Sequence, residues 1–305
     1  MSMGVLNNIA ATYAANNLSN TQASLQNVLT QLSSGSRINS GADDAAGLSL
    51  ANGLQANQSA LTQSASNVNL GVGLLQTADG ALSQVNNLLN RAVTLATEAG
   101  NGTLNASQDA AANQEYQSIL AEINNIGATT TYNGNAVFGA SASIYTSDGT
   151  ATGTSVDTLT IAALKSSSVG DANGTITYTA AVAGTSPATI SYAVGTGATD
   201  KVDLSTTDLT SSANAQAALT AIGTAITDIA GQRGYLGSQI NTLNSMAGVE
   251  TTQSENLASA SNSIMATDYT QATSMLSKYQ ILTQTGISAL AQANSTQQAV
   301  TKLLQ

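Results

Sequence analysis

The chain has 305 residues, a formal charge of −10 and only 8% charged residues, and it contains neither Cys nor His. Without these two residue types it cannot use a thiol nucleophile, an imidazole base, a disulfide or the usual zinc site. Its seven basic residues lie far apart in the sequence, which argues against a nucleic-acid groove. We therefore expect no enzyme, no catalytic residue, no cofactor and no metal site.

The amino-terminal sequence predicts neither a cleaved signal peptide nor a membrane anchor. No basic residue precedes Arg37, and Met1–Tyr13 is interrupted by Asn, Ser and Thr, unlike the apolar region of a secretory signal. No uninterrupted apolar run reaches the length of about 18 residues that a membrane span requires. We expect no membrane insertion.

The first predicted element is a helix over about residues 5–33, which ends at Ser33-Ser34-Gly35. Its small and apolar residues recur at seven-residue steps in two adjacent rows. These rows are Ala11, Leu18, Leu25 and Leu32, and Ala14, Thr21 and Val28. The spacing is typical of a helix that packs against a partner helix.

A second, longer helix is predicted from the next heptad row. The row consists of Leu54, Leu61, Val68, Leu75, Leu82 and Leu89. Ser40, Asp43 and Asp44 are expected to cap its start, and Gly100 and Gly102 to end it. Adjacent helical residues point about 100° apart, so the two Asp residues cannot form a catalytic dyad; capping or a subunit contact is the expected role.

Gly71-Val72-Gly73 lacks the third glycine of a dinucleotide fingerprint and is expected to allow close packing against a neighbouring helix.

Two further helices follow the same argument. One covers about residues 106–126, with apolar positions at Ala112, Tyr116, Ile119, Ile123 and Ile126. The other has apolar residues three and four apart from Leu219 to Ala247, and Arg233 is the only break in that pattern.

Between Tyr132 and Leu209 the sequence becomes rich in Gly, Ser and Thr, which predicts a small β insertion. Its carboxylates do not have the spacing of a calcium-binding loop. The expected strands are Ser143–Thr146, Thr158–Ile161, Thr175–Ala180 and Thr189–Val194, separated by turn residues.

The last predicted helix covers about residues 263–303. Its expected seam comprises Met265, Ala272, Met275, Tyr279, Leu282, Ala289, Ala293, Val300 and Leu303. Gly286 and Thr296 interrupt it, and isolated helices gain most of their stability from packing. Both ends of the chain therefore look like helices that need partners.

Three segments closely resemble the terminal signatures of bacterial flagellins. They are Gln31–Leu48, with the sequence QLSSGSRINSGADDAAGL, Ala266–Lys278, and Ile281–Asn294, with the sequence ILTQTGISALAQAN. The similarity covers about residues 1–138 and 206–305, in the order that the family shows. Residues 139–205 resemble no family that we can name.

The resemblance implies a mainly α fold, in which the terminal segments form a helical coiled coil or rod and the centre carries a small β-rich insertion. The implied domains are a coiled-coil core of residues 1–40 with 263–305, a helical rod with a β-hairpin of residues 41–165 with 206–262, and an outer insertion of residues 166–205. The polymerisation seams would contain Leu18, Leu25, Leu32, Met275, Leu282, Val300 and Leu303. The terminal helices of such proteins stay disordered until they polymerise.

The family also implies a function and a set of partners. The chain would be a structural subunit that polymerises with copies of itself into the extracellular flagellar filament used for swimming. It would be secreted by the flagellar type III export apparatus, with an export chaperone and without a cleaved signal peptide. Hook-associated and cap proteins would be further partners.

A possible receptor contact is also implied by the family, many members of which are bound by the innate receptor Toll-like receptor 5. Asn90–Leu95 resembles the bound stretch and retains Arg91 and Leu95, and Glu115 matches the facing acidic position. Val93 and Thr94 replace a second basic residue and a Glu that strongly recognised members have. Under the alternative interpretation, Arg91 is simply a solvent-exposed or subunit-contact residue.

Two alternatives remain open at this point. The hook–filament junction protein shares the terminal architecture, although Ala45-Ala46-Gly47 and the Ile281–Asn294 tail favour the filament subunit. The insertion could also add an adhesin or receptor-binding module, which binding assays on residues 139–209 would test. A metalloprotease insert is excluded, because its zinc motif requires His.

Overall fold

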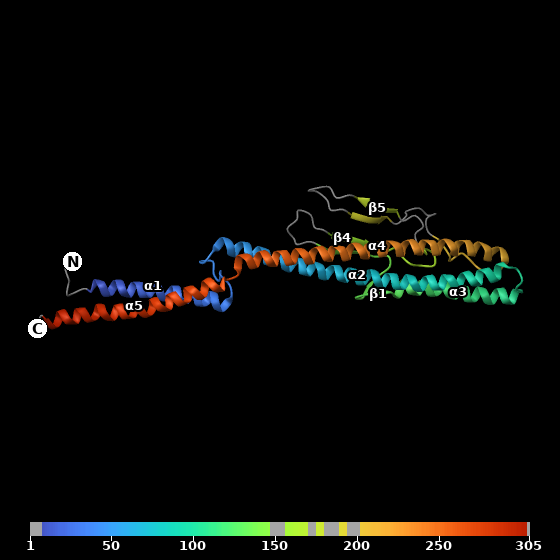
Figure 1. Ribbon diagram of the computed structural model, residues 1–305. Coiled ribbons are helices and arrows are strands. Elements are labelled where there is room, and N and C mark those ends of the chain that lie inside the picture. Colours follow the sequence, from blue (N-terminus) through green and yellow to red (C-terminus); the bar gives the residue numbers. More distant parts are fainter. Residues whose placement is uncertain (1–7, 147–155, 170–174, 180–188, 194–201, 304–305) are drawn as a thin grey trace. The chain divides into compact units, whose positions relative to one another are not determined.

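The computed structural model describes the chain except for residues 1–7, 147–155, 170–174, 180–188, 194–201 and 304–305. The fold is mainly α, with a small β-rich centre, as predicted (Figure 1). Its helices are α1 (Ile9–Ser34), α2 (Ala45–Gly100), α3 (Ala106–Thr129), α4 (Ser212–Met265) and α5 (Tyr269–Leu303). The chain divides into two compact units, unit 1 (Met1–Ala56 with Asn256–Gln305) and unit 2 (Asn57–Glu255). No helix in the described part is long and apolar enough to cross a membrane.

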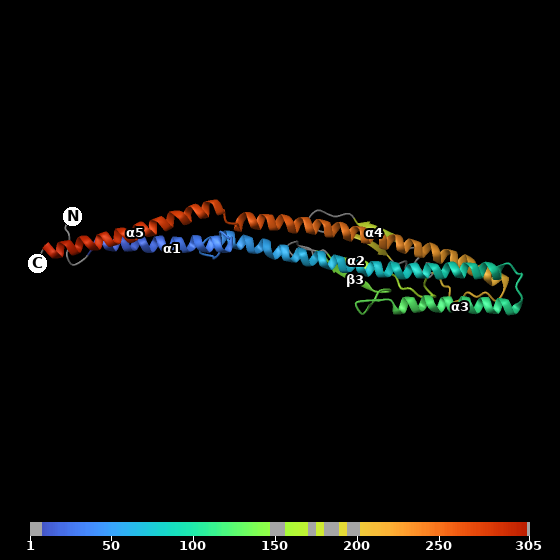
Figure 2. The same cartoon turned by 60° about the horizontal axis from the view of Figure 1, so that its bottom comes forward.

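Unit 2 is built around the antiparallel helices α2 and α4, which Figures 1 and 2 show side by side. The predicted heptad row of α2 is buried from Leu61 to Leu89. An equivalent seven-residue row of α4 is buried in the same core and comprises Ile222, Ile229, Leu236 and Leu243. Arg233, the break in the apolar pattern of α4, forms an ion pair with Asp79 of α2, with 2.7 Å between Nε and Oδ1. The positive charge that interrupts the apolar pattern of α4 is thus paired with a carboxylate of α2.

Helix α3 lies against the other side of α2 and starts with a capping box formed by Asn105 and Gln108. Its apolar face, which includes Tyr116 and Ile123, is buried. The segment of chain just before α4 is hydrogen-bonded to this helix. The Asn113 side chain accepts a hydrogen bond from the main-chain N–H of Leu209 at 2.9 Å, and the Gln117 side chain donates one to the carbonyl of Thr207 at 3.0 Å.

The described strands form three antiparallel hairpins. Strands β1 (Thr131–Tyr132) and β2 (Asn135–Ala136) flank a tight turn at Asn133-Gly134, whose φ angles of 50° and 79° suit this residue pair. Strands β3 (Ser141–Tyr145) and β4 (Val156–Thr160) pair from Ser141↔Thr160 to Tyr145↔Val156. Strands β5 (Thr175–Thr179) and β6 (Thr189–Ala193) form the third hairpin. The four predicted β runs therefore overlap β3 to β6, and their end residues Ala180 and Val194 lie outside the described residues. The two-residue strands of the first hairpin were too short to be located from sequence.

The expectation that Gly71 and Gly73 approach a neighbouring helix is met only at Gly71, where a Cβ would lie 3.5 Å from Cδ1 of Leu243 in α4. The closest neighbours of both glycines come from strands instead. A Cβ on Gly71 would lie 1.9 Å from Cδ1 of Ile144 in β3, and one on Gly73 would lie 2.7 Å from the Tyr132 hydroxyl in β1. The two glycines thus let the β1–β2 hairpin and β3 lie directly on α2. Alternating β patterns give no indication of which helix surface they cover, so the sequence could not supply these partners.

The start of α2 also differs from the prediction. Ser40 does not cap the helix, which begins at Ala45. Of the three residues expected there, Asp44 caps the helix, since its Oδ1 accepts a hydrogen bond from the N–H of Gly47 at 2.8 Å. Asp43 accepts hydrogen bonds from the main-chain N–H groups of Asn39 and Ser40, and so orders the preceding loop.

The predicted final helix, 263–303, is wrong at its start because α4 continues to Met265 and α5 begins at Tyr269. The break has a local cause. Oδ1 of Asp268 accepts hydrogen bonds from the N–H groups of Thr270 and Gln271, which is the geometry of an N-cap. A single long seam over the whole segment is therefore not formed.

Candidate functional site

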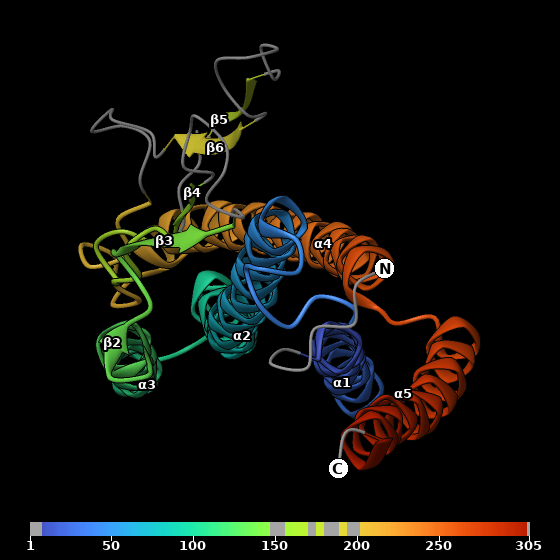
Figure 3. The ribbon, with the colours of Figure 1, turned by 90° about the vertical axis from the view of Figure 1, so that its left-hand side faces the viewer.

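Unit 1 contains an antiparallel pair of helices, α1 and α5, which Figure 3 shows side by side. Asn8 caps α1 by accepting a hydrogen bond from the N–H of Ala11, and its amide also donates to the carbonyl of Ala293 in α5 at 3.1 Å. Further along, a Cβ on Gly286 would lie 3.2 Å from Cδ1 of Leu18. The glycine that interrupts the predicted seam thus lets a leucine of α1 pack closely on the backbone of α5.

The two helices meet along an inner row of side chains that are half-buried or buried. On α1, the row includes the predicted seam residues Leu18, Leu25 and Leu32, together with buried Val28. On α5, it comprises Ala272, Leu276, Tyr279, Thr283, Gly286, Leu290, Ala293 and Gln297. The steps of four and three residues along α5 are those of a coiled-coil seam. Val28 and Ala272 are the only members of the two rows that are buried in the described part, so the pair has a thin core.

Met275 and Leu282, which the sequence placed on the same seam, lie outside this inner row. Their exposed fractions are 38% and 41%, and Ile281 and Ile287 of the same helix are also exposed. We call these four residues the outer apolar set of α5. The side chains of Val300 and Leu303 lie outside the described residues. The predicted seam of α5 is therefore divided between two faces of the helix.

Exposed apolar side chains are concentrated in unit 1. Of the twelve large hydrophobic side chains that are exposed in the described part, nine belong to this unit. They are the outer apolar set together with Ile9, Tyr13, Leu29, Leu50 and Tyr269. Large exposed apolar side chains that gather in one part of a protein are typical of regions that contact another molecule.

The α1–α5 pair carries almost no charge. α1 has no charged residue between Ile9 and Ser34, and α5 has only Lys278 and Lys302. Nζ of Lys278 lies 5.8 Å from the ring centroid of Tyr279. Contacts made by this surface would therefore rest on apolar, amide and hydroxyl groups.

The loop after α1 is fastened to the chain between α4 and α5. Ser36 and Ala266 form an isolated antiparallel bridge, in which the N–H of Arg37 donates to the carbonyl of Met265 at 2.6 Å. The Arg37 guanidinium donates to the carbonyl of Ile264 at 3.0 Å. Its positive charge thus lies at the carboxyl end of α4, where the helix dipole favours a cation.

The residues that the sequence assigned to receptor recognition are only partly on the surface. Arg91 and Glu115 are exposed and form an ion pair, with 2.7 Å between Nε and Oε1. The hydrogen bond from Arg91 lowers the pKa of Glu115 below its ordinary value. Leu95 is 3% exposed and belongs to the hydrophobic core of unit 2.

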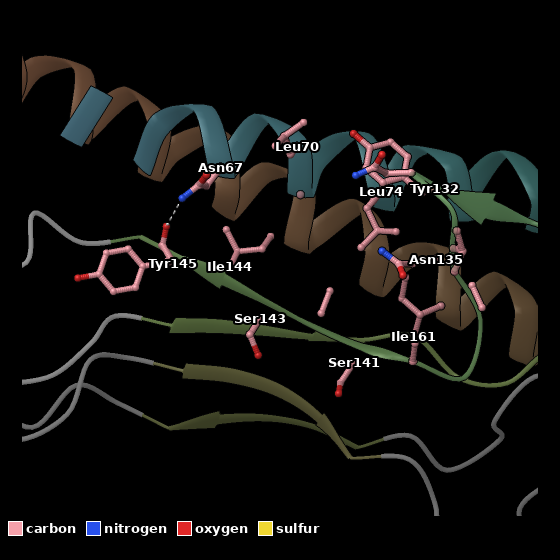
Figure 4. Close-up of a pocket in the computed structure, with 16 residues that line it drawn as sticks. Asn67, Leu70, Leu74, Tyr132, Asn135, Ser141, Ser143, Ile144, Tyr145 and Ile161 are labelled. Carbon is pink, nitrogen blue, oxygen red and sulfur yellow. Dashed lines mark hydrogen bonds between the residues drawn. The ribbon is translucent and has the colours of Figure 1, made fainter. Parts of the chain in front are cut away.

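Unit 2 has an open groove of about 940 Å³ between α2, the β1–β2 hairpin and β3 (Figure 4). Leu70, Leu74, Tyr132 and Ile144 lie along it with Asn and Ser side chains, and no charged residue lines it. The groove therefore presents hydroxyl, amide and apolar groups, and no carboxylate, ammonium or guanidinium group. Elsewhere in the described part, no group of three or more Asp or Glu side chains is arranged to hold a metal ion.

Comparison with known proteins points to one family. The bacterial flagellin N-terminal helical region matches residues 5–143, and the flagellin C-terminal helical region matches residues 219–304. A flagellin of Listeria monocytogenes serovar 1/2a is 33% identical over 274 residues, and one of Listeria innocua serovar 6a is 32% identical over the same length. Each alignment covers 90% of this chain and 90% of the relative. Among solved structures, the crystal structure of Bacillus cereus flagellin is 30% identical, with a TM-score of 0.44, and the match covers 64% of this chain and 94% of that one.

Proposed function

The chain belongs to the bacterial flagellin family, the structural subunits of the flagellar filament, and we propose that it polymerises mainly through the α1–α5 pair. The observation that carries this proposal is the concentration of exposed apolar side chains in unit 1. The inner row joins α1 to α5 within one subunit. The outer apolar set then contacts neighbouring subunits.

The thin core of unit 1 supports this assignment. The buried hydrophobic residues that the structure describes there are Val28, Ile38, Ala51 and Ala272, whereas unit 2 holds the main core. Burying a large apolar side chain completely is worth roughly 1.5–3 kcal/mol. Subunit contacts over the outer apolar set therefore supply burial that a free α1–α5 pair lacks. In the unpolymerised protein, we expect both terminal segments, residues 1–40 and 263–305, to be disordered, so their amides should exchange rapidly with solvent.

Substitution of the outer apolar set tests the proposal. In the double variant Met275→Gln/Leu282→Gln, we expect the critical concentration for seeded polymerisation to rise roughly 30-fold. This corresponds to a loss of about 2 kcal/mol if each side chain buries its exposed part in the filament. Sedimentation and electron microscopy measure the effect.

Val249→Gln is the matched control, because Val249 is an exposed apolar residue of α4 in unit 2. It should leave the critical concentration within about twofold of the parent. Equal effects of the control and the double variant, or no effect of either, would show that the outer apolar set is not the polymerisation surface.

The three-region organisation follows as part of the same proposal. Residues 1–40 with 263–305 form the filament core, residues 41–165 with 206–262 form the rod, and residues 166–205 form an outer insertion. Export through the flagellar type III apparatus with a chaperone, and contacts with hook-associated and cap proteins, complete the set of proposed partners. The filament location is extracellular.

Recognition by Toll-like receptor 5 would have to use Arg91 and Glu115, since buried Leu95 cannot reach a receptor in this structure. If this surface is recognised, Arg91→Ala should reduce the response of receptor-bearing reporter cells to the purified protein. An unchanged response would leave Arg91 with the role of a subunit-contact or solvent-exposed residue.

A further inference from the structure

A polar pair, Ser64 of α2 and Glu250 of α4, is buried in the seam of unit 2. Their exposed fractions are 1% and 6%, and the Ser64 hydroxyl donates to Oε1 of Glu250 at 2.6 Å. The carbonyl of Tyr145, at the end of β3, lies 3.4 Å from the same hydroxyl. It also accepts a hydrogen bond from the Asn67 side chain, at 3.4 Å (Figure 4). One serine hydroxyl thus lies between a carboxylate and the end of a strand.

The hydroxyl has a single proton and cannot donate fully to both oxygens. When Glu250 is ionised, the shorter and charge-assisted bond to the carboxylate is favoured. When Glu250 is protonated, its own O–H can donate to Oγ of Ser64, which frees the serine proton for the carbonyl of Tyr145. The direction of both hydrogen bonds therefore depends on one proton.

We propose that Glu250, Ser64 and the carbonyl of Tyr145 form a proton-responsive clasp that fastens β3 to the α2–α4 pair. Proton uptake turns the Ser64 hydroxyl from the carboxylate toward the strand. Ile144, the residue before Tyr145, packs on Gly71 of α2, so the clasp lies next to a contact between β3 and the helix. The established structural role of the family does not require this device.

Among the described side chains, Glu250 has no ion-pair partner. β4 carries Asp157, which pairs with Ile144 of β3 in the hairpin. α2 presents Ser64 and Asn67 here, and its nearest charged residue in the sequence is Asp79, fifteen positions beyond Ser64. β3 contributes Tyr145, whose phenol is partly exposed, as its one titratable side chain. α4 itself carries Glu255, which is exposed. Within the described residues, Oε2 of Glu250 is buried and has no hydrogen-bond partner.

Burial raises the pKa of Glu250 above its ordinary value, and the hydrogen bond from Ser64 only partly opposes this. Because the folded pKa is higher than the unfolded one, protonation favours the folded unit. The stabilisation is complete below the unfolded pKa and is lost as the pH rises through the folded pKa. The clasp is therefore firmer in mildly acidic solution.

Nuclear magnetic resonance on the full-length, unpolymerised chain tests the clasp directly. Labelling Tyr with carbonyl ¹³C and Thr with ¹⁵N selects the three Tyr–Thr steps of the sequence, at Tyr145, Tyr178 and Tyr269. The Tyr145 carbonyl signal should shift as the pH falls from about 8 to about 4, with a midpoint above the ordinary Glu value of ~4.3. The side-chain carboxyl carbon of Glu250 should titrate with the same midpoint.

Three variants separate the clasp from a general effect of pH. Ser64→Ala should leave Glu250 titrating but abolish the response of Tyr145, and Glu250→Gln should hold the Tyr145 signal near its acidic position at every pH. Glu255→Gln, which removes an exposed carboxylate of the same helix, should behave like the parent. A Tyr145 signal that is flat in the parent, or that still titrates in Ser64→Ala, would overturn the proposal. A Glu250 midpoint at or below the ordinary value would do the same. Should Glu250→Gln fail to fold, the pH response of the Tyr145 signal in Ser64→Ala, compared with that in Glu255→Gln, still tests the clasp.

Discussion

Adding one methyl group at Gly127 of α3 tests how tightly the loop after β4 is packed. A Cβ at this position would lie 2.0 Å from the main-chain oxygen of Leu164 and 2.9 Å from its carbonyl carbon. These are backbone atoms of a buried residue, so they cannot move aside by a side-chain rotation. Gly127→Ala must therefore displace the loop from the helix.

Three contributions set the change in the free energy of unfolding that Gly127→Ala should cause. Replacing Gly by Ala inside a helix gains about 0.8–1.0 kcal/mol when space is available. Forcing an extra methyl group into a packed core costs about 1–3 kcal/mol. The displaced loop also strains two hydrogen bonds, from the Ser166 N–H to Asn124 at 2.7 Å and from Asn124 to the Ser166 hydroxyl at 2.9 Å. Each bond is worth about 0.5–1.5 kcal/mol, so the three contributions together give a net destabilisation of about 1–5 kcal/mol.

Gly80→Ala is the matched control, because nothing lies within 4 Å of a Cβ at that position of α2. It should stabilise unit 2 by about 0.8–1.0 kcal/mol, the intrinsic helix preference. Urea unfolding followed by far-ultraviolet circular dichroism measures both changes in the main transition of the full-length chain. If the two substitutions shift the transition in the same direction, the close approach of Leu164 to α3 is wrong.

Three further outcomes are expected. Deleting Gln292–Gln305 should abolish filaments while leaving the main urea transition unchanged, and filaments formed by the truncated chain would contradict the role of α5. Filaments should withstand added salt at neutral pH, because the α1–α5 pair carries few charges to screen; steep dissociation between low and high salt, measured by sedimentation, would count against this. Hydrogen bonds from the Thr210 hydroxyl, the Thr210 N–H and Asn214 lower the pKa of Asp208, so its stabilisation is present above its unfolded pKa and is lost as the pH falls through the folded pKa. Asp208→Asn should therefore cost stability at pH 7 and little at pH ~2, and an equal cost in both unfolding series would refute the argument.

Periodicity was the most informative property of the sequence. The heptad row from Leu61 to Leu89 is buried in unit 2, and the predicted α1 row faces α5. A repeat of this kind is a property of one helix, because side chains seven residues apart lie on one face whatever the helix packs against. The terminal signatures likewise indicated the family, which the comparisons then confirmed.

Local signals were less reliable at the helix ends. Ser40 and Asp44 are both good capping residues, and only the position at which α2 begins decides between them. The break between α4 and α5 shows the same limitation. Asp268 could cap a new helix from its sequence alone, but the pairing of residues 36 and 37 with residues 265 and 266 comes from a distant part of the chain.

By itself, the sequence determined the number and order of the helices but not all of their ends, the approximate positions of most strands, the family and the absence of thiol and imidazole chemistry. The tertiary structure decided which apolar row of α5 is inside. Ala272 and Tyr279 begin one heptad row and Met275 and Leu282 another, only three residues out of phase, and both rows contain apolar side chains. The sequence of α5 does not show which of the two rows faces inward, because that depends on where α1 lies. The same physical reason applies to Gly71, Arg233 and Glu250, each of which has its role set by a side chain or strand from elsewhere in the chain.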